Sequence, residues 1–185
     1  MTEYTEIVDP RLQERVCKRY SGEIAILQAL GFEKLAYKLE TLEPFSAVSR
    51  LPIVLLMRAK GEVLTFPFPL RLACGHPLLV HSEPSSIADC MGMGVKFYTN
   101  FSDHSLLISS TLQSHIALQD DVLRTSSLRI VRNYPSRTPE EAWLSHKRRT
   151  KEMEVQGKTI RNTSTFADYV DISRREELDL KSRGS

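Results

Sequence analysis

The alternation of hydrophobic and polar residues between Gly94 and Thr111 predicts a β-hairpin. Two alternating runs flank a short polar turn in the segment GVKFYTNFSDHSLLISST, which is the usual sequence form of two paired strands. If Asp103 and His104 form the loop, Phe101 pairs with Leu106. Because side chains alternate across a strand, we expect one polar face and one buried face, the latter made of Val95, Phe97, Phe101, Leu106 and Ile108. A one-residue slip would expose the two phenylalanines, so the pattern predicts a firmly held register.

Hydrophobic residues near the N-terminus recur with a helical period. Asp9 and Pro10 form a typical helix start, a capping side chain followed by proline at the first helical position. The pattern predicts one long amphipathic helix over residues 10–30, ended by Gly31. A break at Ser21-Gly22 is the alternative, because glycine weakens a helix interior. Residues 32–42 change to a period of two and predict a strand.

The middle of the chain has a less regular pattern. Residues 51–57 are almost entirely apolar and fit either a central strand or a short buried helix. Together with the run at 63–66 they favour a second hairpin. Residues 67–93 hold four prolines, which cannot donate to a strand ladder. We therefore expect a long irregular loop there, with a short helical turn beginning at 85–89.

Two further helices are expected near the C-terminus. Residues 128–132 fit a short edge strand that arginines protect from edge-to-edge pairing. Thr138, Pro139 and Glu141 then form a capping box that begins a helix over 138–156, with Gly157 beyond its end. Ser164 is the expected cap of a last helix, whose apolar stripe contains Phe166, Tyr169 and Val170.

These elements predict an α+β fold. We expect an antiparallel sheet of about five strands, with the N-terminal amphipathic helix on one face. Residues 1–135 would form the core domain. Residues 136–185 would form a helical C-terminal extension that either packs on the core or projects from it. The second face of the 94–111 hairpin needs a cover, either these late helices or a partner.

Composition adds that the protein resembles ordinary soluble globular chains. Of its 185 residues 41% are hydrophobic and 26% charged. The N-terminus lacks the basic and apolar pattern of a secretory signal. The longest apolar run, residues 51–57, is far shorter than a membrane span. Three cysteines in no framework spacing favour reduced thiols. We expect a cytoplasmic protein.

Four side chains form the only candidate metal site in the sequence: Cys74, His76, His81 and Cys90. Thiolate and imidazole suit zinc, but the spacing lacks the two close pairs of a usual structural site. A small buried hydrophobe is the more ordinary role of cysteine. Cys90 also follows Asp89, but no nucleophile motif surrounds it. Phosphate-binding and dinucleotide-binding glycine motifs are absent from the sequence as well. We therefore expect no metal, no cofactor and no catalytic residue.

Positive charge is concentrated late in the chain. The net charge is +2, yet residues 124–161 alone carry ten Lys/Arg and four Asp/Glu. The densest part lies in the 138–156 helix, and its candidate partner-binding residues are Trp143, Lys147, Arg148, Arg149 and Lys151. Like charges at Lys147 and Lys151 repel one another mildly, which hints at an anionic partner. A solvated helix face is the simpler interpretation.

Three functions stay open. The favoured one is a non-catalytic protein-interaction or adaptor module that acts through its C-terminal helices on another protein. The alternative is a small-molecule-binding domain or enzyme with a site formed by the 67–93 loop over the sheet. The further alternative is a weak binder of nucleic acid or an anionic surface through residues 147–161, although such proteins usually carry more positive charge. Self-association is open too, and no motif is specific enough to name a family.

Overall fold

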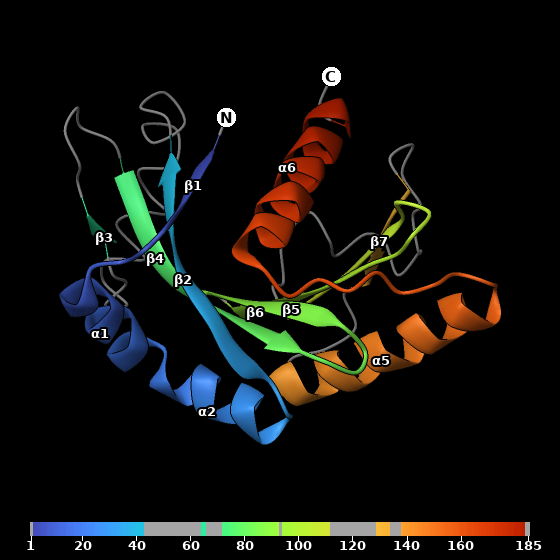
Figure 1. Cartoon of the computed structure of the whole chain (residues 1–185), viewed down its shortest axis with the longest axis horizontal. Coiled ribbons are helices and arrows are strands. Elements are labelled where there is room, and N and C mark those ends of the chain that lie inside the picture. The colour runs from blue at the N-terminus through green and yellow to red at the C-terminus, as the bar shows by residue number, and fades with distance from the viewer. Residues whose placement is uncertain are drawn as a thin grey trace.

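A mixed β-sheet with helices on both faces forms the described part of the protein (Figure 1). The computed structural model describes residues 2–42, 64–65, 72–92, 94–111, 129–133 and 138–183. The helices are α1 (Pro10–Arg19), α2 (Ser21–Ala29), α5 (Pro139–Val155) and α6 (Phe166–Arg183). The strands are β1 (Glu3–Glu6), β2 (Glu33–Leu42), β3 (Leu64–Thr65), β4 (Leu72–His81), β5 (Ser86–Met91), β6 (Gly94–Asn100), β7 (Leu106–Ser110) and β8 (Ile130–Asn133).

The strand order is β1-β2-β4-β5-β6-β7-β8, and β3 pairs with β4 beside this path. Every pair is antiparallel except β7 with β8, which is parallel. The predicted α+β class is confirmed. The expected five-stranded, purely antiparallel sheet is wrong, because the described sheet has eight strands and a parallel edge.

The predicted N-terminal helix is divided in two. Asp9 caps α1 as expected, accepting a hydrogen bond from the Arg11 N–H at 2.9 Å. The helix breaks at Tyr20, directly before Ser21, where the buried Tyr20 hydroxyl lies 2.8 Å from His76 Nδ1. Gly31 follows α2 with a φ of +92°, a left-handed conformation that glycine adopts without strain.

The expected irregular loop over 67–93 is wrong, because most of its described residues form β4 and β5. Pro77 lies within β4 opposite Tyr37 of β2. On the other side of β4, pairing with β3 ends at Cys74 and pairing with β5 begins at Leu78, so Pro77 falls between the two described ladders. The expected helical turn at 85–89 is strand β5 instead. Residues 51–57 lie outside the described residues, and of 63–66 only β3 is described.

The hairpin is confirmed as β6 and β7, but its register differs by one residue from the prediction. Asn100, and not Phe101, pairs with Leu106. Phe101 instead begins the turn, donating its N–H to the Ser105 carbonyl at 2.9 Å, and His104 adopts a φ of +62°. As a result the expected apolar face is divided between the two sides of the sheet.

Burial on both faces explains why the predicted register was wrong. Figure 1 shows α1, α2 and α5 on one face and α6 on the other. Val95 and Phe97 pack in the first layer with Trp143 of α5, whereas Leu106 and Ile108 pack in the second with α6. A sheet covered on both sides does not need strict alternation of polar and apolar residues. The late helices therefore supply the cover that the second face requires.

The C-terminal helices begin close to where the sequence predicts. Thr138 caps α5 and accepts a hydrogen bond from the Glu141 N–H at 3.3 Å, and Gly157 follows with a φ of +87°. Thr165, rather than Ser164, exchanges capping hydrogen bonds with Asp168 at the start of α6. Among the described helices, none combines the length and hydrophobicity that crossing a membrane requires.

Candidate functional site

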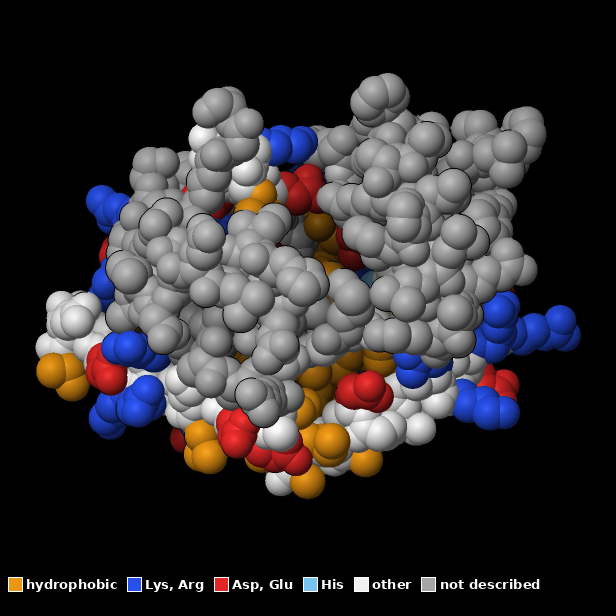
Figure 2. Space-filling view, turned by 180° about the vertical axis from the view of Figure 1, so that it is seen from behind, with side chains coloured by type: hydrophobic (Ala, Val, Ile, Leu, Met, Phe, Trp, Pro, Cys, Tyr) orange, Lys and Arg blue, Asp and Glu red, His pale blue; other side chains and the backbone are white. Residues whose placement is uncertain are grey.

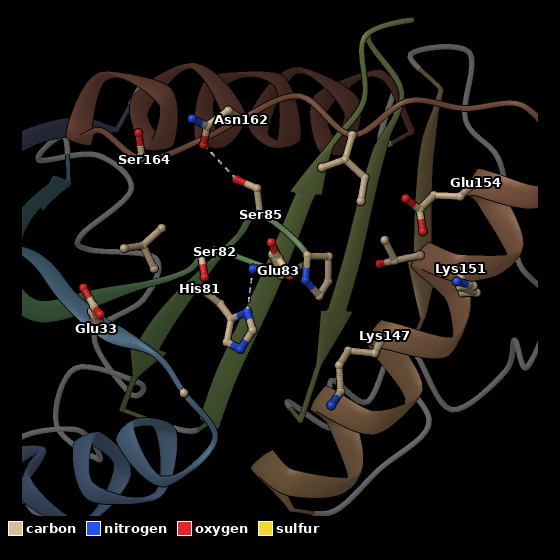
Figure 3. Close-up of a pocket in the computed structure, with 15 residues that line it drawn as sticks. Glu33, His81, Ser82, Glu83, Ser85, Lys147, Lys151, Glu154, Asn162 and Ser164 are labelled. Carbon is tan, nitrogen blue, oxygen red and sulfur yellow. Dashed lines mark hydrogen bonds between the residues drawn. The ribbon is translucent and has the colours of Figure 1, made fainter.

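A cavity of about 950 Å³ lies between the β4–β5 turn and helix α5 (Figure 3). We call it the turn pocket. Its volume is within the range typical of small-molecule sites. Four segments line it: the end of the α2–β2 connection, the turn itself, one side of α5, and the chain between α5 and α6. Its residues are Gly31, Glu33, Val80, His81, Ser82, Glu83, Pro84, Ser85, Lys147, Thr150, Lys151, Glu154, Ile160, Asn162 and Ser164.

The imidazole of His81 is held against the aromatic core. Its ring centroid lies 5.0 Å from that of Phe32 and 4.9 Å from that of Trp143. Its Nδ1 accepts a hydrogen bond from the Glu83 N–H at 3.2 Å, so the neutral ring carries its proton on Nε2. A Cβ atom at Gly31 would lie 3.0 Å from that Nε2. Glycine at position 31 therefore permits both the left-handed backbone conformation of the turn and the close approach of the His81 ring.

Ser85 fastens the turn to the chain beyond α5. Its hydroxyl donates to Asn162 Oδ1 at 3.2 Å and accepts from the Thr163 N–H at 2.9 Å. Thr163 is buried. Two segments far apart in the sequence are thus joined at one wall of the pocket, which gives that wall a defined shape.

Two lysines on α5 face the turn pocket without a counter-ion. Lys147 and Lys151 are exposed, lie four residues apart, and form no ion pair with any described residue. The Lys147 ammonium lies 5.6 Å from the centroid of the Trp143 ring. Like charges at this spacing destabilise a helix by about 0.2–0.5 kcal/mol. An anionic group bound between them would relieve this repulsion.

Carboxylates line the rest of the pocket. Figure 3 shows Glu33 across the pocket from α5, with Glu83 between them and Glu154 farther along α5. These three side chains also form no ion pair within the described part of the chain. The pocket is therefore bipolar: α5 contributes both lysines and also Glu154, whereas Glu33 and Glu83 on the opposite side are acceptors for hydrogen-bond donors. Serine, threonine and asparagine side chains lie between the two.

A second cavity, of about 450 Å³, lies on the other side of α5 and differs in its electrostatics. Its cations include Arg149 and Lys158, which are already paired. The Arg149 guanidinium lies 2.6 Å from the Glu152 carboxylate, and the Lys158 ammonium lies 2.9 Å from the Asp103 carboxylate. The unpaired lysines of the turn pocket therefore make it the stronger candidate for binding an anion.

The four candidate metal ligands are distributed along β4 and β5. Cys74 and Cys90 are buried, and burial, followed by the charge of Asp89, raises the pKa of the Cys90 thiol. His76 is bonded to Tyr20, and His81 lines the turn pocket. No group of three or more His, Cys, Asp or Glu side chains among the described residues is arranged to hold a metal ion.

The predicted partner-binding residues lie on different sides of α5. Trp143 is only 1% exposed and packs against Phe32 and Phe97 in the core, so a partner cannot contact it without opening the fold. Lys147 and Lys151 line the turn pocket, whereas Arg149 lines the second cavity. Arg148 is exposed and 3.9 Å from Glu152.

Over the whole described surface, as on α5, the lysine and arginine side chains do not form one patch. Seen from behind in Figure 2, lysine and arginine side chains lie toward both sides of the molecule and are interspersed with acidic side chains. Nucleic-acid-binding domains usually cluster their cations on one face or along one helix.

No local sequence pattern indicates the network around His146. This imidazole is fully buried, with Nε2 2.8 Å from the Thr99 hydroxyl and Nδ1 2.8 Å from the Ser109 hydroxyl. The Thr99 hydroxyl lies 2.7 Å from that of Ser86. Burial lowers the pKa of His146 to about 3. The network joins α5 to three neighbouring strands, and only tertiary contacts bring its members together.

Comparison of the chain with models of known protein families, with curated proteins and with solved structures returned no match.

Proposed function

We propose that this protein is a small-molecule-binding domain whose turn pocket takes a small polar ligand with an anionic group. The observation that carries the proposal is the pair of lysines, Lys147 and Lys151, which face a cavity of ligand size without a counter-ion among the described residues. The anionic group would lie against these ammonium groups. Hydroxyl or amino groups of the same ligand would donate to Glu33 and Glu83 on the other side.

The hydrogen bonds of Ser85 and His81, the reactive side chains of the pocket, favour a binding function over a catalytic one. The Ser85 hydroxyl is bonded to Asn162 and Thr163, and not to an imidazole. The His81 Nδ1 is occupied by a backbone N–H. A catalytic serine requires a base within hydrogen-bond reach. The described residues of the pocket provide a shaped polar surface but no such pair.

Calorimetry with graded anions tests this proposal. We expect citrate or pyrophosphate to bind at low ionic strength and to raise the melting temperature, and glycerol to do neither. The double variant Lys147→Gln/Lys151→Gln should bind the anion at least about tenfold more weakly, because two charge-assisted contacts are removed. Screening of these partly exposed charges should also weaken binding as salt is added.

Arg148→Gln is the matched control for the double variant. Arg148 lies on the same helix and is exposed, but it does not line the turn pocket. Its loss should leave the affinity unchanged. Failure of every anion to bind, or equal weakening by the control and the double variant, would contradict the proposed function.

A protein-interaction module acting through the C-terminal helices is the second proposal. It is supported by the exposed cations Lys147, Arg148 and Lys151 on α5. Deleting residues 138–185 would not test it, because α5 and α6 cover opposite faces of the sheet and their loss would unfold the core. Charge reversal, Lys147→Glu with Arg148→Glu, changes only exposed side chains and should preserve the fold. Recovery of the same partner by the reversed variant and the original chain would refute this proposal.

A further inference from the structure

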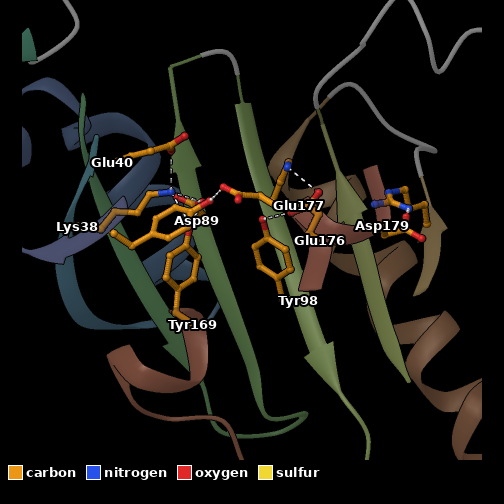
Figure 4. Close-up of polar contacts among 11 residues, drawn as sticks. Lys38, Glu40, Asp89, Tyr98, Tyr169, Glu176, Glu177 and Asp179 are labelled. Carbon is orange, nitrogen blue, oxygen red and sulfur yellow. Dashed lines mark hydrogen bonds and ion pairs between the residues drawn. The ribbon is translucent and has the colours of Figure 1, made fainter. Parts of the chain in front are cut away.

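A third, smaller cavity lies between α6 and the sheet, remote from the turn pocket. We call it the α6 cavity. It measures about 160 Å³ and is lined on the sheet side by strands β1, β2, β5 and β6. The side chains that matter for its chemistry are Tyr4, Lys38, Asp89, Tyr98, Tyr169 and Glu177. Figure 4 shows Glu177 reaching from α6 toward the pair formed by Lys38 and Asp89.

The Lys38 ammonium is fully engaged inside this cluster. It lies 2.7 Å from Asp89 Oδ2, 2.5 Å from the Tyr169 hydroxyl and 3.5 Å from Glu40 Oε2. An ammonium group has three hydrogen-bond donors, so these three acceptors use all of them. The Tyr169 hydroxyl in turn donates to Asp89 Oδ2 at 2.9 Å. Both contacts of Asp89 therefore go to the same oxygen.

The other oxygen, Asp89 Oδ1, is buried and has no hydrogen-bond partner in the described structure. The Asp89 side chain is only 1% exposed, and it lines the cavity. Burial alone would raise the pKa of this carboxyl, but Lys38, and then His76, outweigh it and hold the pKa below its usual value. Asp89 is therefore ionised, and leaving an ionised oxygen unpaired in the interior is energetically unfavourable.

The charges around the cavity favour a cation over an anion. Four carboxylates and two lysines line it. Lys96 is already paired with Glu176 at 2.8 Å, and the second oxygen of Glu176 accepts from the Tyr98 hydroxyl at 3.1 Å. Asp89 Oδ1 and the Glu177 carboxylate remain as acceptors, and among the described residues the Glu177 carboxylate is bonded only to the Tyr4 hydroxyl, at 3.0 Å.

Aromatic rings complete an environment suited to an organic cation. The Lys38 ammonium already lies over the rings of Tyr4 and Tyr169, at 5.7 and 4.8 Å from their centroids. Ring faces attract ammonium and guanidinium groups in this way. The described carboxylates are not grouped as metal ligands. At about 30 Å³ per water molecule, the cavity has room for about five waters, or for a group of a few heavy atoms.

We propose that the α6 cavity binds a small organic cation, an ammonium or guanidinium group, which donates to Asp89 Oδ1 and Glu177 beside the tyrosine rings. This site is independent of the turn pocket and of the function proposed for it. Ethylammonium is a suitable probe because it is small enough for the cavity and has the required donors.

Calorimetry and thermal shift with ethylammonium chloride test the site, with sodium chloride matching the ionic strength. Ethanol is the neutral probe of similar shape and sodium acetate the anionic one. We expect ethylammonium to bind saturably and to raise the melting temperature, and the other two probes to do neither. Glu177→Gln should weaken ethylammonium binding at least about threefold, since it removes one charge at the cavity and keeps the side-chain shape.

Asp171→Asn is the matched control, because it removes one negative charge from an exposed position on α6 that does not line the cavity. Its affinity for ethylammonium should equal that of the original chain. The Lys147→Gln/Lys151→Gln variant should also keep this affinity, which separates the site from the turn pocket. Equal effects of ethanol and ethylammonium, binding of acetate instead, or equal weakening by Glu177→Gln and Asp171→Asn would each overturn the proposal.

Discussion

The buried imidazole of His146 ties the stability of the fold to pH. Both of its ring nitrogens are bonded to hydroxyl groups, and burial lowers its pKa to about 3. In the unfolded chain the pKa of histidine is about 6.5. Between these two values the unfolded state binds a proton that the folded state does not. Stability must therefore fall as the solution is acidified through this interval.

We predict that acidification from pH 7 to pH 5 lowers the free energy of unfolding by roughly 2 kcal/mol through His146 alone. Urea unfolding at the two pH values measures the loss, and His146→Gln should reduce it. Since that variant also disturbs the hydroxyl network, NMR titration of the His146 ring provides a direct check. A ring that becomes protonated between pH 7 and pH 5 in the folded protein would contradict the prediction.

Individual residues of the candidate site were predicted from the sequence only in part. Lys147 and Lys151 stood out because their repulsion is visible as a local spacing. The sequence presents His81 only as a candidate metal ligand, and its packing against Phe32 and Trp143 depends on contacts between distant segments. Lys38 and Asp89 could not be recognised as partners, because only the order of strands β2, β4 and β5 brings them together.

At the scale of elements, α6 meets the sheet at ion pairs that are buried or partly buried, as well as through apolar packing. Lys38 with Asp89, Lys96 with Glu176, and Arg132 with Asp179 all lie at this interface. Tyr169 of α6 is bonded to both members of the first pair. Removing charges from water is costly, so such pairs depend on both partners being present.

We predict that Asp89→Ala lowers the free energy of unfolding by about 3–5 kcal/mol, because it leaves the Lys38 ammonium buried without its main partner. In a separate cycle, the double variant Lys38→Met/Asp89→Leu should be less destabilised than the sum of the single changes Lys38→Met and Asp89→Leu. Urea denaturation of the four proteins in the cycle measures the coupling. Additive losses, or a loss below about 1 kcal/mol for Asp89→Ala, would show that the pair does not hold α6.

Element boundaries were predictable where a local cap marks them. Asp9, Thr138 and Gly31 identify helix ends through hydrogen bonds or backbone conformations that involve only neighbouring residues. The hairpin register was not predictable in this way, because α6 buries apolar side chains on the face that the alternation predicts to be polar. Strand β4 was not predicted, because a proline at position 77 is typical of a loop. The structure accommodates Pro77 within β4 at a position where the strand has no described partner on one side.

At the scale of the whole molecule, the fold joins two features that the sequence presented separately. The 81–85 turn came from the region expected to hold a loop site, and Lys147 and Lys151 came from the basic segment. They line one cavity because Trp143 anchors α5 on the same face of the sheet as Phe32 and Phe97. Local patterns predict such elements, but they do not specify which distant elements meet.

NMR chemical-shift mapping with citrate tests the central claim, that the turn pocket binds a small anionic ligand. We expect the amide resonances of Ser82, Ser85 and Asn162, together with the side-chain resonances of Lys147 and Lys151, to shift together and to saturate at one affinity. Resonances of Arg149 and Lys158, whose charges are already paired in the second cavity, should stay unchanged. Shifts confined to that second cavity, or no saturable shift around the turn pocket, would contradict the account.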